Sequence, residues 1–304
     1  MLLPINQIRN KILDVKYGRI KQGLKMGIEP IDNHLRFAPA SFDIIIGHSN
    51  VGKTTFIIYL FVVWAIKHQL KFIVWSSENT PDSIVRKIIE FKMGKPVQKS
   101  TDEEITEALT WCDKHFKIIN VDRLYTYKDV LKEIKGINDA YPCDAALIDP
   151  YNSLAKDKDS FKSFGGHEYD YLVCSTMRLF TAENNITIYL NCHGVTDALR
   201  KVYPKGHEYE GYPMPLMGSQ VEGGGKFLNR SNQLFSLHRM TQHPELWMYT
   251  QLHTLKVKEI ESYGAKPTVL DEPLQFRMQK NNVGFEFCGR DLLHEKKDIK
   301  QLEF

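Results

Sequence analysis

The strongest constraint in this sequence is the segment GHSNVGKT at residues 47–54, which fits the pattern GxxxxGK[ST]. An apolar run, SFDIIIG at residues 41–47, leads into it, and a longer apolar run at residues 55–68 follows. A buried strand, a glycine-rich turn and a helix in this order gather backbone N–H groups and a helix N-terminus around a phosphate. A chance match is improbable in this context, so the segment predicts a site for ATP or another nucleoside triphosphate.

Each position of this segment has an expected task. Lys53 is expected to reach the β- and γ-phosphates as a catalytic residue, and the hydroxyl of Thr54 is expected to hold Mg²⁺. The predicted nucleotide-binding residues are Gly47, His48, Ser49, Asn50, Val51, Gly52, Lys53, Thr54 and Thr55.

From residue 23 onward, short apolar runs alternate with longer stretches of helical periodicity. This alternation predicts an α/β fold, with a mostly parallel central sheet and helices on both faces. After Leu234 the pattern changes to short strands, which predicts an antiparallel C-terminal extension of the same sheet. The predicted strands are 41–47, 71–76, 116–121, 145–148 and 186–191, and the predicted helices are 55–68, 82–92, 101–115, 127–138 and 168–184. Residues 156–166 and 196–226 are glycine-rich and are predicted to be irregular.

No shift in composition divides the main part of the chain into two domains. Residues 1–22 carry spaced aliphatic side chains among polar ones, which predicts an N-terminal arm or linker helix too small to form its own core. Residues 23–290 are predicted to form one domain, and residues 291–304 a C-terminal tail.

Composition excludes several classes of protein. The 40 lysines and arginines nearly balance 37 acidic residues, so the chain is not a strongly basic nucleic-acid coat protein. Its five cysteines are scattered without paired metal-ligand spacing, which favours reduced thiols over disulfides or zinc. The longest apolar run, residues 56–66, is too short to span a membrane, and the N-terminus lacks the features of a signal peptide. We therefore expect a soluble protein inside a cell, without a membrane partner.

Two acidic residues follow predicted strands near the phosphate-binding segment. Asp149 ends the run DAALID, and ligands collect at the carboxyl ends of parallel strands, which favours Asp149 as a metal ligand. Asp144, at the start of this run, is predicted to lie on the surface. Glu78 follows the strand at residues 71–76, where a carboxylate can polarise the water that attacks the γ-phosphate. From position alone, a surface or helix-capping role for Glu78 is equally compatible.

A series of segments in this order resembles the RecA-type motor domain of DnaB-like replicative helicases, including phage and Twinkle-like members. The segments are GHSNVGKTT, WSSENTP, AALIDPYNSL, IYLNCHG, GGGKFLNRSNQLFSLHR and LKVKE. Residues 23–47 also resemble the stretch that leads into that family's first core strand. The resemblance covers about residues 23–287 and implies a RecA-like P-loop ATPase fold.

The resemblance also implies roles for individual residues. Glu78 matches the catalytic glutamate, Asp149 the metal-associated aspartate, and His193 a γ-phosphate sensor that would otherwise be a polar cap after a strand. Residues 219–230 match a loop that lines a central channel and holds single-stranded DNA, where glycine N–H groups and cations face phosphates. From spacing alone, a mobile surface loop is the simpler interpretation of this segment. The implied DNA-binding residues are Gly224, Gly225, Lys226 and Arg230.

The sequence departs from the family at two places. Many members carry Lys-x-Arg, with the arginine acting on the neighbouring subunit's nucleotide, whereas this chain has Lys256-Val257-Lys258. We expect Lys258 to act as this catalytic finger, with Lys256 as the alternative. Residues 1–46 are too few for the family's primase module or collar, so we expect a separate primase or a motor that works alone. The terminal Phe304 is a candidate polymerase contact, although a frayed tail is the simpler interpretation.

The implied function is an ATP-dependent replicative DNA helicase. Such a protein is a homo-oligomeric, hexameric ring on single-stranded DNA, here in the cytoplasm of a bacterial or phage-infected cell. The alternative is a RecA-like recombinase or annealing ATPase that forms filaments on DNA. A metabolic P-loop kinase is disfavoured because the sequence shows neither an arginine-rich lid nor an acceptor site.

Overall fold

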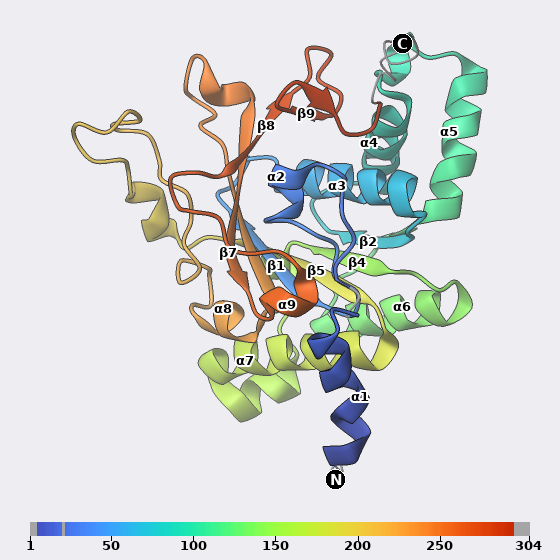
Figure 1. Ribbon diagram of the computed structural model, residues 1–304, viewed down its shortest axis with the longest axis vertical. Helices are drawn as coiled ribbons and strands as arrows, with labels where there is room; N and C mark the ends of the chain where they lie inside the picture. The colour runs from blue at the N-terminus through green and yellow to red at the C-terminus, as the bar shows by residue number, and fades with distance from the viewer. Residues whose placement is uncertain (1–4, 20–21, 295–304) are drawn as a thin grey trace.

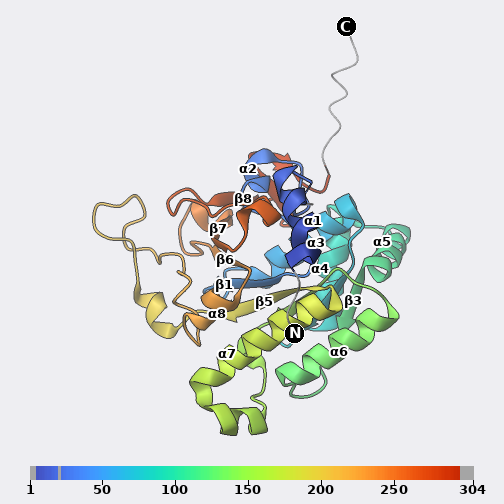
Figure 2. The same cartoon turned by 60° about the horizontal axis from the view of Figure 1, so that its bottom comes forward.

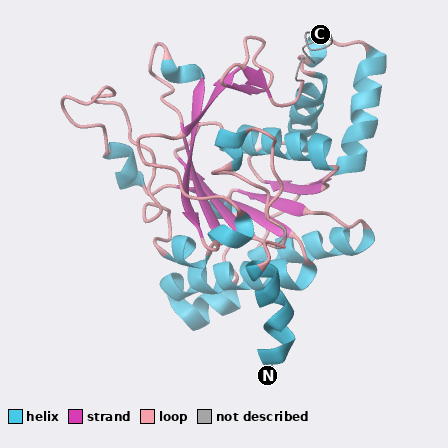
Figure 3. Ribbon diagram, in the orientation of Figure 1, coloured by secondary structure: helices cyan, strands magenta, loops and turns pink. Residues whose placement is uncertain are grey.

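The computed structural model describes residues 5–19 and 22–294, and its centre is one sheet (Figures 1 and 3). Among the described residues the strand order is β10-β9-β8-β7-β6-β1-β5-β4-β2-β3. The strands from β3 to β6 in this order are parallel, and those from β7 to β10 are antiparallel. This confirms the predicted sheet and its antiparallel extension. The strands are β1 Phe42–Gly47, β2 Phe72–Ser76, β3 Phe116–Ile119, β4 Ala145–Asp149, β5 Thr187–His193, β6 Gln233–His238, β7 Tyr249–Val257, β8 Leu274–Met278, β9 Phe285–Phe287 and β10 Arg290–Asp291.

Helices cover both faces of the sheet, as Figure 2 shows. Neighbouring residues on a strand point to opposite faces, so each strand contributes to two apolar cores. On β1, Ile45 packs into the core that contains residues of α3, α4 and α5, whereas Ile44 and Ile46 pack into the core with α6 and α7. The helices are α1 Ile5–Lys16, α2 Glu29–Asp32, α3 Lys53–His68, α4 Pro81–Met93, α5 Asp102–His115, α6 Tyr127–Ala140, α7 Lys158–Asn184, α8 Lys226–Arg230 and α9 Ile260–Tyr263, with short 3₁₀ turns η1 Val97–Lys99, η2 Tyr151–Ser153, η3 Thr196–Arg200 and η4 Leu246–Met248.

One predicted irregular segment is mostly helical, so that prediction is wrong. Residues 158–166 form the first part of α7, and Gly165 (φ 69°, ψ 170°) marks the kink at which two helices meet. The carboxylate of Asp157 caps the first helix by accepting a hydrogen bond from the Ser160 amide at 2.9 Å. Glycine permits the kink without ending the helical run. Residues 196–226 contain only η3, turns, isolated bridges and the first residue of α8, as predicted.

The N-terminal arm forms the helix α1, which extends beyond the sheet in Figure 1. Its aliphatic side chains are open to solvent, with Ile5 80% and Ile12 58% exposed. No described helix has the length and apolar character needed to cross a membrane. Phe304 and residues 295–303 of the predicted tail lie outside the described residues.

A buried carboxylate lies in the sheet at the start of β1. Asp43 is fully buried and accepts hydrogen bonds from the Ser41 hydroxyl and, at 3.0 Å, from the Gln233 side-chain amide on β6. Burial disfavours the charged form and raises the pKa of Asp43 to about 7, although both hydrogen bonds lower it. The fold therefore favours the protonated carboxyl.

Replacing Asp43 by asparagine is expected to change how folding stability depends on pH. The stabilising contribution of Asp43 is complete below its unfolded pKa of about 4 and is lost as the pH rises through about 7. Asparagine resembles the protonated form, and the unpartnered Gln233 Oε1 can accept from the new amide after a flip. In urea denaturation, the free energy of unfolding of Asp43→Asn relative to the parent should rise from about pH 5 to pH 7 and then level off.

The control is Asp197→Asn, at a side chain that is 88% exposed and should show no such trend. A constant difference between Asp43→Asn and the parent across this pH range would contradict the assignment.

Candidate nucleotide site

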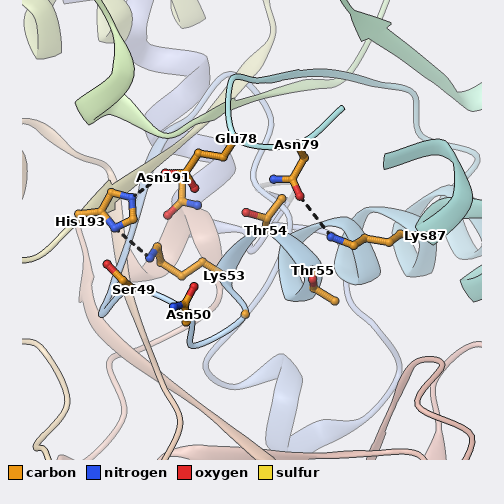
Figure 4. A pocket seen from close by; sticks show the side chains of 11 residues that line it. Ser49, Asn50, Lys53, Thr54, Thr55, Glu78, Asn79, Lys87, Asn191 and His193 are labelled. Atoms are coloured by element: carbon orange, nitrogen blue, oxygen red, sulfur yellow. Dashed lines mark hydrogen bonds and ion pairs between the residues drawn. The ribbon is translucent and has the colours of Figure 1, made fainter. Parts of the chain in front are cut away.

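A cavity of about 320 Å³ lies at the carboxyl ends of the central parallel strands (Figure 4). Strand β1 ends at Gly47, β4 at Asp149 and β5 at His193, and Glu78 follows β2 by two residues. Ligands of open parallel sheets bind at this edge. The lining residues are Ser49, Asn50, Gly52, Lys53, Thr54, Thr55, Glu78, Asn79, Lys87, Asn191 and His193.

The turn between β1 and α3 has the geometry of a phosphate-binding loop. Asn50 and Gly52 have positive φ angles of 63° and 88°, which close a tight turn directly before the N-terminus of α3. A Cβ atom on Gly47 would lie 2.6 Å from the carbonyl oxygen of Leu237, so only glycine fits there. The loop therefore presents the N-terminus of a helix to the cavity, where an anion is stabilised.

Lys53 is buried, and its amine is held at the floor of the loop. Nζ donates to the carbonyl oxygens of Gly47 at 3.1 Å and His48 at 3.0 Å. Desolvation lowers the pKa of Lys53, while the nearby carboxylates of Asp149 and Glu78 raise it. A phosphate that enters the cavity meets a partly desolvated cation, which interacts more strongly than a solvated one.

Asp149 lies directly behind the loop and is fully buried. Its Oδ2 accepts hydrogen bonds from the hydroxyls of Thr54 at 2.8 Å and Ser76 at 3.0 Å, and its Oδ1 accepts one from the Asn191 amide. Burial raises the pKa of Asp149, and these three hydrogen bonds lower it. The structure thus brings together the two predicted metal ligands, Thr54 and Asp149.

His193 connects the lysine and the glutamate across the cavity (Figure 4). Its Nδ1 lies 3.4 Å from Lys53 Nζ and its Nε2 lies 3.4 Å from Glu78 Oε1. Because the lysine can only donate, Nδ1 is the acceptor, and the ring is neutral with its proton on Nε2 facing Glu78. The structure therefore places three predicted catalytic residues, Lys53, Glu78 and His193, within reach of one another.

Two residues of the predicted nucleotide-binding set do not line the cavity. His48 donates from Nε2 to the Met214 carbonyl at 3.1 Å, and its ring packs edge-on against His238. Burial lowers the pKa of His48, which favours its neutral form. Val51 is buried below the loop. Both support the loop conformation from behind.

The other predicted site residues lie outside this cavity. Gly224 and Gly225 precede α8, and Lys226 is mostly buried with its Nζ 3.9 Å from Asp170. The guanidinium of Arg230 stacks on the ring of Tyr171, 3.9 Å from its centroid.

The two candidate finger lysines differ in their surroundings. Lys256 Nζ donates to the carbonyls of Leu228 and Ser231 at the end of α8, whereas the Lys258 side chain is exposed. Both lie where β7 pairs with the start of β6, at the sheet edge opposite the cavity.

Sequence reasoning missed three lining residues. Asn191 lies two residues before His193 on β5, so the alternation of strand side chains was an available signal. Lys87 comes from α4 and donates to Asn79 Oδ1 at 3.4 Å. Only the packing of α4 brings these two side chains to the cavity, and no short motif marks that.

Comparison with known proteins agrees with this geometry. No protein-family model matches the chain. The Twinkle homolog protein, chloroplastic/mitochondrial, of Arabidopsis thaliana is 23% identical over 243 residues, which are 75% of this chain and 32% of that protein. The chain thus spans about a third of the length of this curated relative.

Solved structures show the same architecture. The ATPase domain of one DnaB-like helicase superposes with a TM-score of 0.71 at 11% identity, covering 91% of this chain and 97% of that one. A second DnaB-like replicative helicase, solved in a study of its interactions with primase, gives 0.70 at 10% identity, covering 94% and 67%. The fold is that of a DnaB-like helicase motor domain. A KaiC-like protein of Pyrococcus horikoshii is similar at a lower TM-score of 0.56, with 14% identity and coverages of 88% and 99%. The DnaB-like fold thus extends over nearly the whole chain.

Replacing Lys53 by alanine is expected to weaken nucleotide binding. The change removes the cation that faces the phosphates, and losing a charge-assisted hydrogen bond typically weakens binding by about tenfold to a hundredfold. Titration with a fluorescent ATP analogue in Mg²⁺ measures the Kd. Lys67→Ala, at the other end of α3, is the matched control and should bind as the parent does. Equal affinity of Lys53→Ala and the parent would contradict the placement of phosphate at this loop.

Proposed function

We propose that this protein is the motor of an ATP-dependent replicative DNA helicase, which hydrolyses ATP or another nucleoside triphosphate while it moves along single-stranded DNA. The observation that carries the proposal is the placement of Lys53, Glu78 and His193 around one cavity in a DnaB-like fold. The likeness to the Twinkle homolog supports the same conclusion. Nucleotide hydrolysis and translocation are the activities that the proposal assigns to this chain.

Each cavity residue has a task in hydrolysis. Glu78 acts as the general base, because its carboxylate faces the cavity and accepts a proton from the attacking water. His193 orients Glu78 through its Nε2 proton and responds to the γ-phosphate. Lys53 stabilises the charge that develops on the phosphate oxygens.

The residues near the loop also fit a magnesium ion. The Thr54 hydroxyl and the Asp149 carboxylate are hard oxygen donors in mutual contact at 2.8 Å. Mg²⁺ favours such a pair, completed by substrate phosphates and water. When bound, the ion supplies charge that neutralises the phosphates. Thr54 and Asp149 are the residues that would hold it.

The glycine segment before α8 is the proposed contact with single-stranded DNA. Gly224 has a positive φ of 83°, and neither Gly224 nor Gly225 has a neighbour within 4 Å of a built Cβ atom, so their backbone is open to a phosphate. Arg230 stacks on Tyr171 and offers a nearby cation. Lys226 takes part only when it leaves Asp170, because its amine is mostly buried there. These contacts neutralise the DNA backbone without reading its sequence.

A ring of identical subunits explains where Lys258 lies. It is exposed at the sheet edge opposite the subunit's own cavity, so it can act only on a nucleotide held by another subunit. Lys256 is the weaker candidate for this finger, because its amine already binds the carbonyl end of α8. We propose a homohexameric ring in which Lys258 completes the neighbouring site.

The exposed isoleucines of α1 fit the same assembly. A helix with Ile5 80% and Ile12 58% exposed gains stability when a neighbouring subunit covers these side chains. We propose that this arm docks on the adjacent motor, with a separate primase or polymerase as the replication partner.

Strand displacement on a forked DNA duplex tests the function directly. The parent with ATP and Mg²⁺ should release the labelled strand, and its hydrolysis rate should rise when single-stranded DNA is added. Glu78→Gln should keep its affinity for ATP but lose turnover by about 10²–10⁴-fold and lose strand release, because the general base is gone. Glu107→Gln, an exposed change on α5, is the control and should behave as the parent.

Other outcomes select other functions. DNA annealing or strand exchange without unwinding would favour a RecA-like recombinase. Hydrolysis that ignores DNA would oppose any DNA motor. Turnover by Glu78→Gln at the parent rate would show that the base assignment is wrong.

Mixing subunits tests the role of Lys258. Lys258→Ala subunits should bind ATP normally yet lower the turnover of parent subunits beside them, because each finger serves its neighbour's site. Such fingers contribute about 10³–10⁵ in rate as arginine, and a lysine without the bidentate fork should contribute less. The steady-state ATPase rate is measured against the mutant fraction, with Lys266→Ala, an exposed lysine, as control. A loss strictly proportional to the mutant fraction would argue against a shared site.

A further inference from the structure

Strand β5, which carries the proposed sensor His193, is joined directly to the glycine segment. Beyond the end of β5, Gly194 forms an antiparallel bridge with Val221. The Glu222 amide donates to the His193 carbonyl at 3.1 Å. His193 and the residue just before Gly223 are therefore neighbours in a short ladder, so a displacement of one acts on the other through a single hydrogen bond.

Asn152 spans this ladder from the other side. It lies in η2, three residues after Asp149, and its Oδ1 accepts the His193 backbone N–H at 3.0 Å. Its Nδ2 donates to the Glu222 carboxylate. One side chain thus holds both the sensor and the residue that precedes the glycine segment.

The residue before Asn152 anchors η2 to the same region. The Tyr151 hydroxyl donates to Asp170 Oδ1 at 2.6 Å, and its ring packs edge-on against Phe227 of α8. Gly223 has a φ of 101°, and a built Cβ there would lie 2.8 Å from Asp170 Oδ2. The backbone thus fits against the carboxylate that Tyr151 holds, and η2 has one fixed position relative to the segment.

We propose that Asn152 is a positioning residue that couples the nucleotide state at His193 to the conformation of the glycine segment, and so to its affinity for single-stranded DNA. The inference rests on the proposed function. Asn152 touches neither nucleotide nor DNA and acts through the two groups that it binds. Coupling of this kind is a difference in binding free energy between two sites, which makes it measurable as a ratio of affinities.

The test compares the Kd of labelled oligothymidylate with and without a non-hydrolysable ATP analogue and Mg²⁺. In Asn152→Asp the carboxylate still accepts the His193 N–H but faces Glu222 with like charge and no donor. Its nucleotide Kd and thermal midpoint should match the parent, while the ratio of DNA affinities, expected at about 5–150-fold in the parent, should fall toward one. Adding Glu222→Gln should restore the ratio, because the glutamine amide donates to the new carboxylate.

Two single variants complete the cycle. Glu222→Gln alone keeps an oxygen that accepts from Asn152 and should retain the parent ratio, as should the exposed control Asn120→Asp. An unchanged ratio in Asn152→Asp, or a reduced ratio that Glu222→Gln does not rescue, overturns the coupling role alone. A parent that binds oligothymidylate with no dependence on nucleotide also overturns it. A parent that does not bind oligothymidylate at all overturns the proposed function and this inference together.

Discussion

The buried carboxylate of Asp149 is the interaction on which the candidate site depends. It joins the end of β4 to β2 through Ser76, to β5 through Asn191 and to α3 through Thr54. A buried carboxylate is costly unless donors satisfy it, and here three donors fix its position. The phosphate loop, the glutamate strand and the sensor strand are therefore held in one arrangement before any nucleotide binds.

The two edges of the sheet separate the tasks of the molecule. The cavity lies at the carboxyl ends of the parallel strands, while Lys258 lies at the opposite edge because β7 runs antiparallel to β6. Within one subunit these two groups cannot meet. The antiparallel extension thus supplies a surface that is useful only to a neighbouring copy, and the same geometry leaves Lys256 to stabilise the end of α8.

Much of this arrangement was predictable, because the sequence writes parallel sheets as apolar runs with functional residues at their ends. The glycines and Lys53 identify the loop, and Asp149 and Glu78 follow β-branched or aromatic runs by zero and two residues. The helical segment after Asp157 was missed because its glycines suggested a loop, whereas the capping aspartate starts a helix that Gly165 only kinks. Lys87 was missed because helix packing, rather than sequence spacing, brings it to the cavity.

The sequence by itself determined the order of strands and helices and the chemical identity of the nucleotide loop. These depend on local periodicity and on contacts between residues close in the chain. Only the tertiary structure decided that Lys226 faces Asp170, that Lys256 is occupied by α8, and that Asn152 lies between His193 and Glu222. These contacts join residues 25 to 70 positions apart. Their partners are chosen by how helices and loops pack across the sheet, which no local pattern specifies.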